Sequence, residues 1–157
     1  MVRKILLAAL VASSTGAMAA PSAVFLRQAI DGNFSEVTLG RIIQNRGGSA
    51  QVRQFGAMLV RDHSNGLAQA QRIAARLRLR ILPGLTPEAR SETGRLRHLS
   101  GRAFDLEVRR YMIQDHRNDI REFKAQARSG DRATAGYAAA IVPVMRRHLL
   151  AAQAIRG

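Results

Sequence analysis

The feature that most constrains this chain is the spacing of its apolar residues, which recur every three or four positions over four long segments. This is the period of a helix with one buried face, whereas the two-residue alternation typical of a strand is nearly absent. Alanine, leucine, arginine and glutamine dominate these segments, and all four residue types favour helix. The sequence therefore predicts an all-α fold.

Breaker residues divide the helical pattern into four long helices and one short helix. We expect the long helices at about residues 21–46, 49–79, 101–128 and 131–155, and the short one at about 86–99. Pairs of glycine with glycine, proline or serine separate them, and Ser49 and Thr86 are predicted N-caps. Pro143 lies inside the last helix, where a kink or a local break is expected.

Four amphipathic helices predict a four-helix bundle. The connection between the second and third long helices has about 20 residues, which is long enough for a crossover that lets these two helices run parallel. We therefore expect residues 20–157 to form one domain, a ferritin-like four-helix bundle with a short extra helix in that connection.

Residues 1–19 have the three zones of a secretory signal peptide. Basic residues come first, residues 5–12 are apolar, and the small residues Ala17 and Ala19 stand where a signal peptidase reads them. The apolar run is too short to span a hydrocarbon core of about 30 Å. We expect this segment to be removed and the mature protein to be periplasmic or secreted, either free or peripherally associated with the cell envelope.

The composition is strongly basic and lacks cysteine, with 25 Lys and Arg against 11 Asp and Glu and a formal net charge of +14. Without cysteine there are no disulfides, thiol catalysis or thiolate metal sites. The basic excess would attract an anionic envelope component such as lipid head groups or polysaccharide, unless it is only a solvated surface. Aromatic residues are few and no nucleic-acid motif is recognisable, so no specific nucleic-acid partner is expected.

Polar residues interrupt the apolar faces near the middle of the long helices. His63, His116 and His148 lie on the apolar faces of three different long helices, and Glu36 lies on the apolar face of the helix at 21–46. At a rise of 1.5 Å per residue their depths agree within about one turn, so the four side chains converge on one layer. A glutamate and three neutral imidazoles suit one divalent metal ion, namely zinc, iron or manganese. The remaining histidine, His98, is expected in solvent.

Aspartates precede two of these histidines. Asp62 and Asp115 each point about 100° away from the adjacent histidine, so we expect them to orient a histidine on a neighbouring helix through its ring N–H. Asp119 and Glu122 are spare carboxylates near the same face of the third long helix. The competing interpretation is a buried network without metal, in which Glu36 and the histidines satisfy one another and the aspartates pair with arginine.

Several short motifs follow one another in a recognisable order. They include Glu36-Val37, Asp62-His63, Leu82-Pro83, Tyr111-Met112, Asp115-His116, and Pro143 with His148. Over roughly residues 22–155 this layout resembles DUF4142, a large bacterial family of exported proteins of unknown function that are often labelled "predicted outer membrane protein". The resemblance implies a ferritin-like bundle in the periplasm or at the cell envelope, with no established reaction.

The usual di-iron signature of such bundles is missing. Di-iron bundles carry Glu-x-x-His on two helices, but the residues three before the histidines are Val60, Ile113 and Met145. No catalytic residue is assigned. Three hypotheses remain: a non-enzymatic, stress-related envelope bundle that binds one metal ion; a metalloenzyme with redox or hydrolytic chemistry at the same residues; and an arginine-rich adaptor for anionic envelope polymer or lipid.

Overall fold

The computed structural model describes residues 16–129 and 131–156, which form five helices and no strand. The helices are α1 (Gly16–Arg46), α2 (Ala50–Arg76), α3 (Pro87–Leu96), α4 (Gly101–Arg128) and α5 (Ala135–Gln153). The predicted all-α class is confirmed. Most of the predicted signal segment, residues 1–15, lies outside the described residues. Within them, no helix is both long and apolar enough to cross a membrane.

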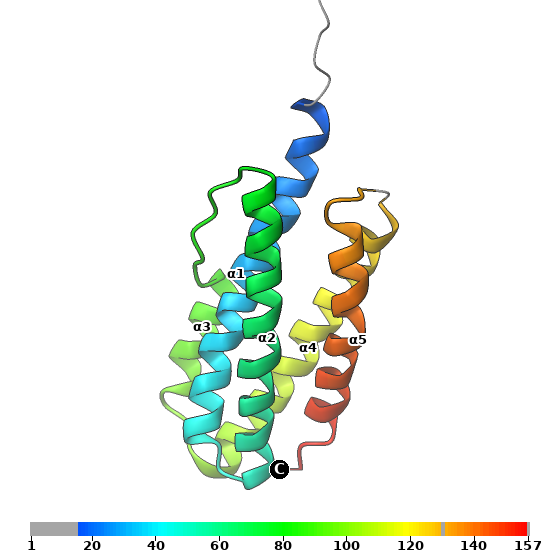
Figure 1. Ribbon diagram of the computed structural model, residues 1–157. Coiled ribbons are helices and arrows are strands. Elements are labelled where there is room, and N and C mark those ends of the chain that lie inside the picture. Colours follow the sequence, from blue (N-terminus) through cyan, green and yellow to red (C-terminus); the bar gives the residue numbers. More distant parts are fainter. Residues whose placement is uncertain (1–15, 130, 157) are drawn as a thin grey trace, which may run out of the picture.

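The four long helices form two antiparallel pairs, α1 with α2 and α4 with α5, packed side by side (Figure 1). Between the pairs the chain returns along the bundle through an extended loop and α3, which packs against α1 and α4 (Figure 1). As a result α2 and α4 run in the same direction, the arrangement that the long connection permits. One long crossover is also the connection of ferritin-like bundles.

Both predicted N-caps cap their helices. The Ser49 hydroxyl accepts a hydrogen bond from Val52 N at 3.2 Å, and the Thr86 hydroxyl accepts one from Ala89 N at 3.2 Å, with Pro87 at the first helical position. In α5 the helix continues through Pro143, so the local break that a proline allows is not present.

Three helix boundaries differ from the expected ones. Helix α1 begins at Gly16 rather than at about residue 21, so it includes the end of the predicted signal segment. The other two differences have a local cause. Helix α2 stops at Arg76 because Arg78 takes a left-handed conformation with φ of 57°, and the N–H of Leu79 then returns to Ala74 O at 2.9 Å. Helix α5 begins at Ala135 because the Asp131 carboxylate accepts hydrogen bonds from Ala133 N and from the Thr134 hydroxyl, which hold the preceding residues in a turn.

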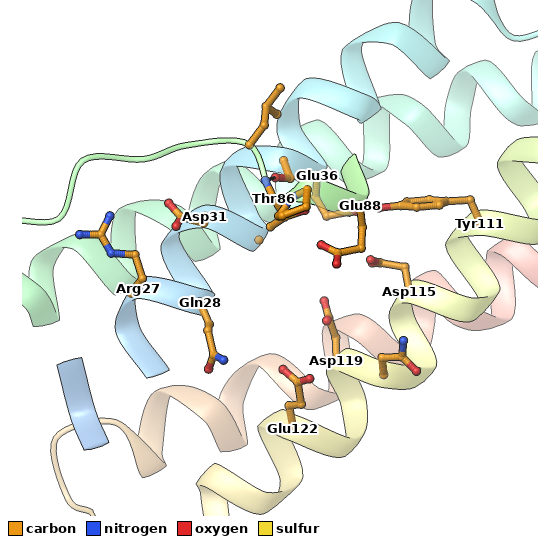
Figure 2. Close-up of a pocket in the computed structure, with 15 residues that line it drawn as sticks. Arg27, Gln28, Asp31, Glu36, Thr86, Glu88, Tyr111, Asp115, Asp119 and Glu122 are labelled. Atoms are coloured by element: carbon orange, nitrogen blue, oxygen red, sulfur yellow. Dashed lines mark hydrogen bonds between the residues drawn. The ribbon is translucent and has the colours of Figure 1, made fainter. Parts of the chain in front are cut away.

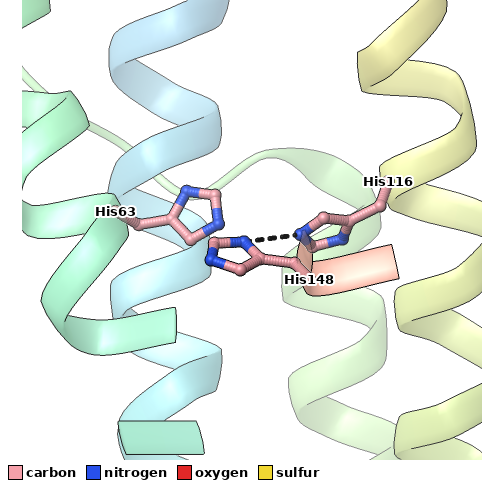
Figure 3. Close-up of side chains that lie close together, drawn as sticks. All are labelled: His63, His116 and His148. Carbon is pink, nitrogen blue, oxygen red and sulfur yellow. Dashed lines mark hydrogen bonds between the residues drawn. The ribbon is translucent and has the colours of Figure 1, made fainter. Parts of the chain in front are cut away.

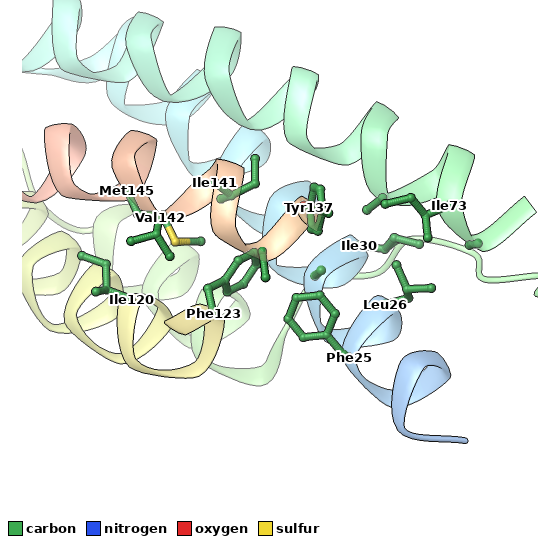
Figure 4. Close-up of a cluster of buried hydrophobic side chains, with 14 residues drawn as sticks. Phe25, Leu26, Ile30, Ile73, Ile120, Phe123, Tyr137, Ile141, Val142 and Met145 are labelled. Atoms are coloured by element: carbon green, nitrogen blue, oxygen red, sulfur yellow. The ribbon is translucent and has the colours of Figure 1, made fainter. Parts of the chain in front are cut away.

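The buried apolar residues form two separate clusters at opposite ends of the bundle. The first, called here the Phe25 cluster, includes Phe25, Leu26, Ile30, Ile73, Phe123, Tyr137, Ile141 and Met145 (Figure 4). The second, the Phe104 cluster, includes Leu39, Ile43, Val52, Phe55, Leu59, Phe104, Val108 and Met112. Each long helix contributes to both clusters, so each helix is fixed at both ends by apolar packing.

Between the two clusters lies a polar layer. On every long helix the interval between the two clusters carries buried polar side chains. They are Asn33, Ser35 and Glu36 on α1, His63 on α2, His116 on α4 and His148 on α5. The layer lies within the bundle, at mid-length.

Candidate metal centre

The structure brings Glu36, His63, His116 and His148 together. Their exposed fractions are 3%, 4%, 1% and 0%. The apolar clusters on either side determine this burial, because the helices cannot rotate these residues outward without exposing the clusters.

The three imidazole rings face one another across the polar layer (Figure 3). His116 Nε2 lies 3.2 Å from His148 Nδ1, and His63 Nε2 lies 3.8 Å from Glu36 Oε2. One ring nitrogen from each histidine lies within 4.8 Å of the other two. The three nitrogens therefore surround one small volume, with the Glu36 carboxylate beside it.

The outer nitrogen of His63 faces Asn33 on α1. Asn33 donates its amide N–H groups to Ala29 O at 2.6 Å and to the Tyr137 hydroxyl at 3.1 Å, which turns its oxygen toward His63. That oxygen lies 3.1 Å from His63 Nδ1, so Nδ1 carries the ring proton and donates it. In neutral His63 the Nε2 atom is then an unprotonated acceptor.

The outer nitrogens of the other two histidines also face acceptors. His116 Nδ1 lies 3.1 Å from the carbonyl oxygen of Met112, and His148 Nε2 lies 3.0 Å from Asp62 Oδ2. Burial acts to raise the pKa of Asp62, but hydrogen bonds from Arg61 and His148 outweigh it and hold the pKa below its usual value. Asp62 is thus an ionised acceptor, and the proton of His148 lies on Nε2.

All three histidines are neutral at ordinary pH. Burial lowers the pKa of His63 well below its usual range and that of His116 to about 3. Burial also lowers the pKa of His148, against the opposing effect of its hydrogen bond to Asp62. Each neutral ring has one proton, and outer acceptors hold all three protons, so the three inward nitrogens present lone pairs to one another.

Such an arrangement is unfavourable without a cation between the rings. Lone pairs on His116 Nε2 and His148 Nδ1 repel at 3.2 Å. His63 Nε2 and Glu36 Oε2 are buried and have no hydrogen-bond partner among the described residues, which costs about 1–3 kcal/mol for each orphaned group. A tetrahedral ion with metal–nitrogen distances of about 2.0–2.1 Å holds its ligand atoms about 3.3 Å apart. His116 Nε2 and His148 Nδ1 lie 3.2 Å apart, and His63 Nε2 and Glu36 Oε2 lie 3.8 Å apart.

The two predicted orienting aspartates take different positions. Asp62 contacts His148 on a neighbouring helix and also binds Arg61 Nε at 2.8 Å. Asp115 contacts no histidine of another helix. Its Oδ2 atom lies 3.6 Å from Nδ1 of the adjacent His116 on the same helix. The Asp115 carboxylate lies close to the Glu36 carboxylate instead.

Two contributors to the site were missed at the sequence level. Asn33 orients His63, and Gly66 makes room for Asn33, since a Cβ atom on Gly66 would overlap the Asn33 side-chain oxygen. The available signal was helical spacing, because Asn33 lies one turn before Glu36 and Gly66 one turn after His63.

Comparison with known proteins gives a family and no activity. The family model described as "Domain of unknown function (DUF4142)" matches residues 7–155, nearly the whole chain. No curated protein and no solved structure matches the chain. The chain belongs to the DUF4142 family.

Proposed function

We propose that this member of the DUF4142 family binds one divalent transition-metal ion through the inward nitrogens of His63, His116 and His148. Glu36 supplies the fourth ligand. The observation that carries the proposal is the hydrogen-bond acceptor on the outer side of each histidine ring, which takes the ring N–H and turns the other nitrogen inward. An outer acceptor of this kind is the usual partner of a metal-bound histidine. Zinc, iron(II) and manganese(II) suit three imidazoles and a carboxylate.

The competing network without metal has a specific weakness. In a closed network every buried nitrogen and oxygen has a partner. Here His63 Nε2 and Glu36 Oε2 lie 3.8 Å apart, too far for a hydrogen bond, and neither has another partner in the described part of the chain. A metal ion supplies what both atoms lack. We therefore favour metal binding over a closed hydrogen-bond network, and metal binding requires no catalytic residue.

We also propose that the binding takes place outside the cytoplasm, at the periplasmic side or the envelope. The support is the signal pattern of residues 1–19, most of which lie outside the described residues. The mass of the chain purified from its native host tests this. A mature protein that begins at Ala20 is expected, and an intact N-terminus in a cytosolic fraction would contradict it.

Metal binding is tested by elemental analysis and by calorimetric titration of the purified protein with zinc. We expect about one ion per chain and, at saturation, stabilisation by a few kcal/mol, since the ion binds only the folded state. His148→Gln should weaken zinc binding by about tenfold or more, because it removes one ligand. His98→Gln is the matched control, since His98 is exposed, two residues after the end of α3, and should change nothing.

A second variant keeps the test informative if a buried substitution prevents folding. Asp62→Asn leaves all four ligands in place but removes the ionised acceptor for His148, which should reduce zinc affinity by about 10- to 100-fold. The proposal fails if the wild-type protein contains less than about a tenth of an ion per chain and shows no thermal shift with zinc, iron(II) or manganese(II).

A further inference from the structure

The acidic residues of this basic protein are concentrated at one place. Of the 11 Asp and Glu residues in the chain, six line a single pocket of about 500 Å³ that opens to solvent. The pocket is bounded by α1, the start of α3 and α4, and the carboxylates of Glu88, Asp115, Asp119 and Glu122 face a common space (Figure 2). The six residues are Asp31, Glu36, Glu88, Asp115, Asp119 and Glu122.

These carboxylates are not neutralised by arginine. Elsewhere in the chain Asp62, Glu92 and Glu107 each contact an arginine within 4.0 Å. Among the described residues, none of the six pocket carboxylates does so. Arg27 lines the pocket but donates to the backbone oxygen of Leu82 at 3.3 Å. In a chain with so many arginines, this leaves the pocket with a local negative charge.

Two buried oxygens at the inner wall of the pocket have no hydrogen-bond partner among the residues that the structure describes. They are Oε2 of Glu36, a residue that is 3% exposed, and Oδ2 of Asp115. The ligand atoms of Glu36, Asp115 and His116 lie within 4.8 Å of one another. Asp119 lies one helical turn after Asp115 and lines the same pocket. An oxygen-rich group with orphaned acceptors is what a cation requires.

We infer that the pocket contains a second cation-binding site, in which Glu36, Asp115 and Asp119 bind a partly hydrated hard divalent cation such as Mn²⁺. Carboxylate oxygens suit such ions, which keep several water ligands, and the open pocket has room for them. The outer nitrogen of His116 is engaged with Met112 O, so the ligands here are oxygens. The site shares Glu36 with the histidine centre but does not require that centre to be occupied.

The test uses Mn²⁺ and the full chain, first loaded with one equivalent of zinc. Free aqueous Mn²⁺ is followed by its electron paramagnetic resonance signal, which falls as the ion binds. We expect about one bound Mn²⁺ per zinc-loaded chain. Asp115→Asn with Asp119→Asn should weaken Mn²⁺ binding by about tenfold or more, because ligand charge sets the affinity of oxygen sites. This pair removes repulsion and should not lower the melting temperature.

A matched control removes the same charge elsewhere. Glu92→Gln with Glu107→Gln changes the net charge equally but lies outside the pocket, and it should leave Mn²⁺ binding unchanged. In zinc-free protein, His63→Gln with His148→Gln should retain the Mn²⁺ site.

Each other outcome separates the two sites. Unchanged Mn²⁺ binding in the Asp115 and Asp119 variant overturns the second site, as does equal weakening in the control pair. If Mn²⁺ binding is lost only when the histidines are replaced, the ion occupies the histidine centre alone, and the second site fails while the proposed function stands. If zinc does not bind but Mn²⁺ binding depends on the aspartates, the proposed function fails and the second site stands.

Discussion

Asn33 fixes the chemistry of His63, although Asn33 is not one of the proposed metal ligands. Its amide is oriented by Ala29 O and the Tyr137 hydroxyl, and this leaves only an oxygen for His63 Nδ1. Sequence patterns predicted which histidines share a layer, because depth along a helix depends only on residue number. They did not predict which ring nitrogen faces inward. That choice depends on acceptors such as the backbone oxygen of Met112, which every residue type possesses.

Glu92 on α3 shows how a buried carboxyl behaves when its arginine partners are imperfectly placed. Its Oε2 lies 3.6 Å from Arg95 and 3.5 Å from Arg110, and its buried Oε1 has no hydrogen-bond partner in the described ranges 16–129 and 131–156. Burial, and then the neighbouring Glu107, raise the pKa of Glu92 to about 7, against the opposing effect of the two arginines. The folded protein therefore binds this proton more tightly than the unfolded chain does.

The consequence is a dependence of stability on pH. Because the folded pKa is above the unfolded value, Glu92 lowers the free energy of unfolding as pH rises from 4.5 to about 7. Above that pH the group is ionised in both states and its effect is constant. We expect Glu92→Gln to raise that free energy at pH 8 by about 1–2 kcal/mol, with little change at pH 4. Urea denaturation at the two pH values measures the difference.

Glu107→Gln is the opposite case. The hydrogen bond from Arg110 holds the pKa of Glu107 below its usual value, so its removal should destabilise the protein at pH 8. Equal effects of the two glutamine substitutions at both pH values would contradict the assignment.

At the scale of single elements, the sequence predicted the number and order of the helices, and errors are confined to their ends. The ends that were predicted well carry standard signals, such as Ser49 and Thr86 as caps. The end of α2 carries no such signal, because the left-handed position that usually belongs to glycine is occupied by Arg78. A non-glycine residue in that conformation cannot be recognised from residue type alone.

Glycine also sets how closely α1 and α2 approach each other. A Cβ atom on Gly56 would lie 2.7 Å from Gly40 O and would overlap the backbone nitrogen of Gln44. These are backbone atoms of α1, so they move only if the two helices separate. Helical spacing alone does not show that the two backbones are in contact.

Gly56→Ala should therefore destabilise the protein by about 2 kcal/mol or more, because overpacked contacts with backbone relax poorly. The control is Gly94→Ala in α3, where a Cβ atom meets nothing within 4 Å. That substitution should be neutral or stabilise by up to about 1 kcal/mol through helix propensity. Thermal or urea denaturation measures both. A neutral Gly56→Ala would show that the helices are not held at this distance.

On the scale of the whole molecule, the polar layer between the two apolar clusters follows from the sequence. Residues at the same distance along packed, rigid helices lie at the same height in the bundle. The acidic pocket does not follow in the same way. Its wall joins α1 and α4 to Glu88 at the start of α3, and the position of α3 depends on how the connecting loop returns along the bundle. Asp119 and Glu122 were noted only as spare carboxylates, since the residues opposite them belong to distant parts of the chain.

The separation of charge over the molecule has a consequence for rates. A divalent cation far from the protein meets a net charge of +14 and is repelled, whereas one at the pocket meets unpaired carboxylates. Salt screens the first interaction more than the second, because screening acts beyond a Debye length of about 10 Å at 0.1 M. Slower Mn²⁺ association at higher ionic strength would show that the pocket controls capture at long range. We expect the opposite: raising ionic strength from about 0.01 to 0.1 M should speed Mn²⁺ association in stopped-flow measurements, so that added salt accelerates cation capture.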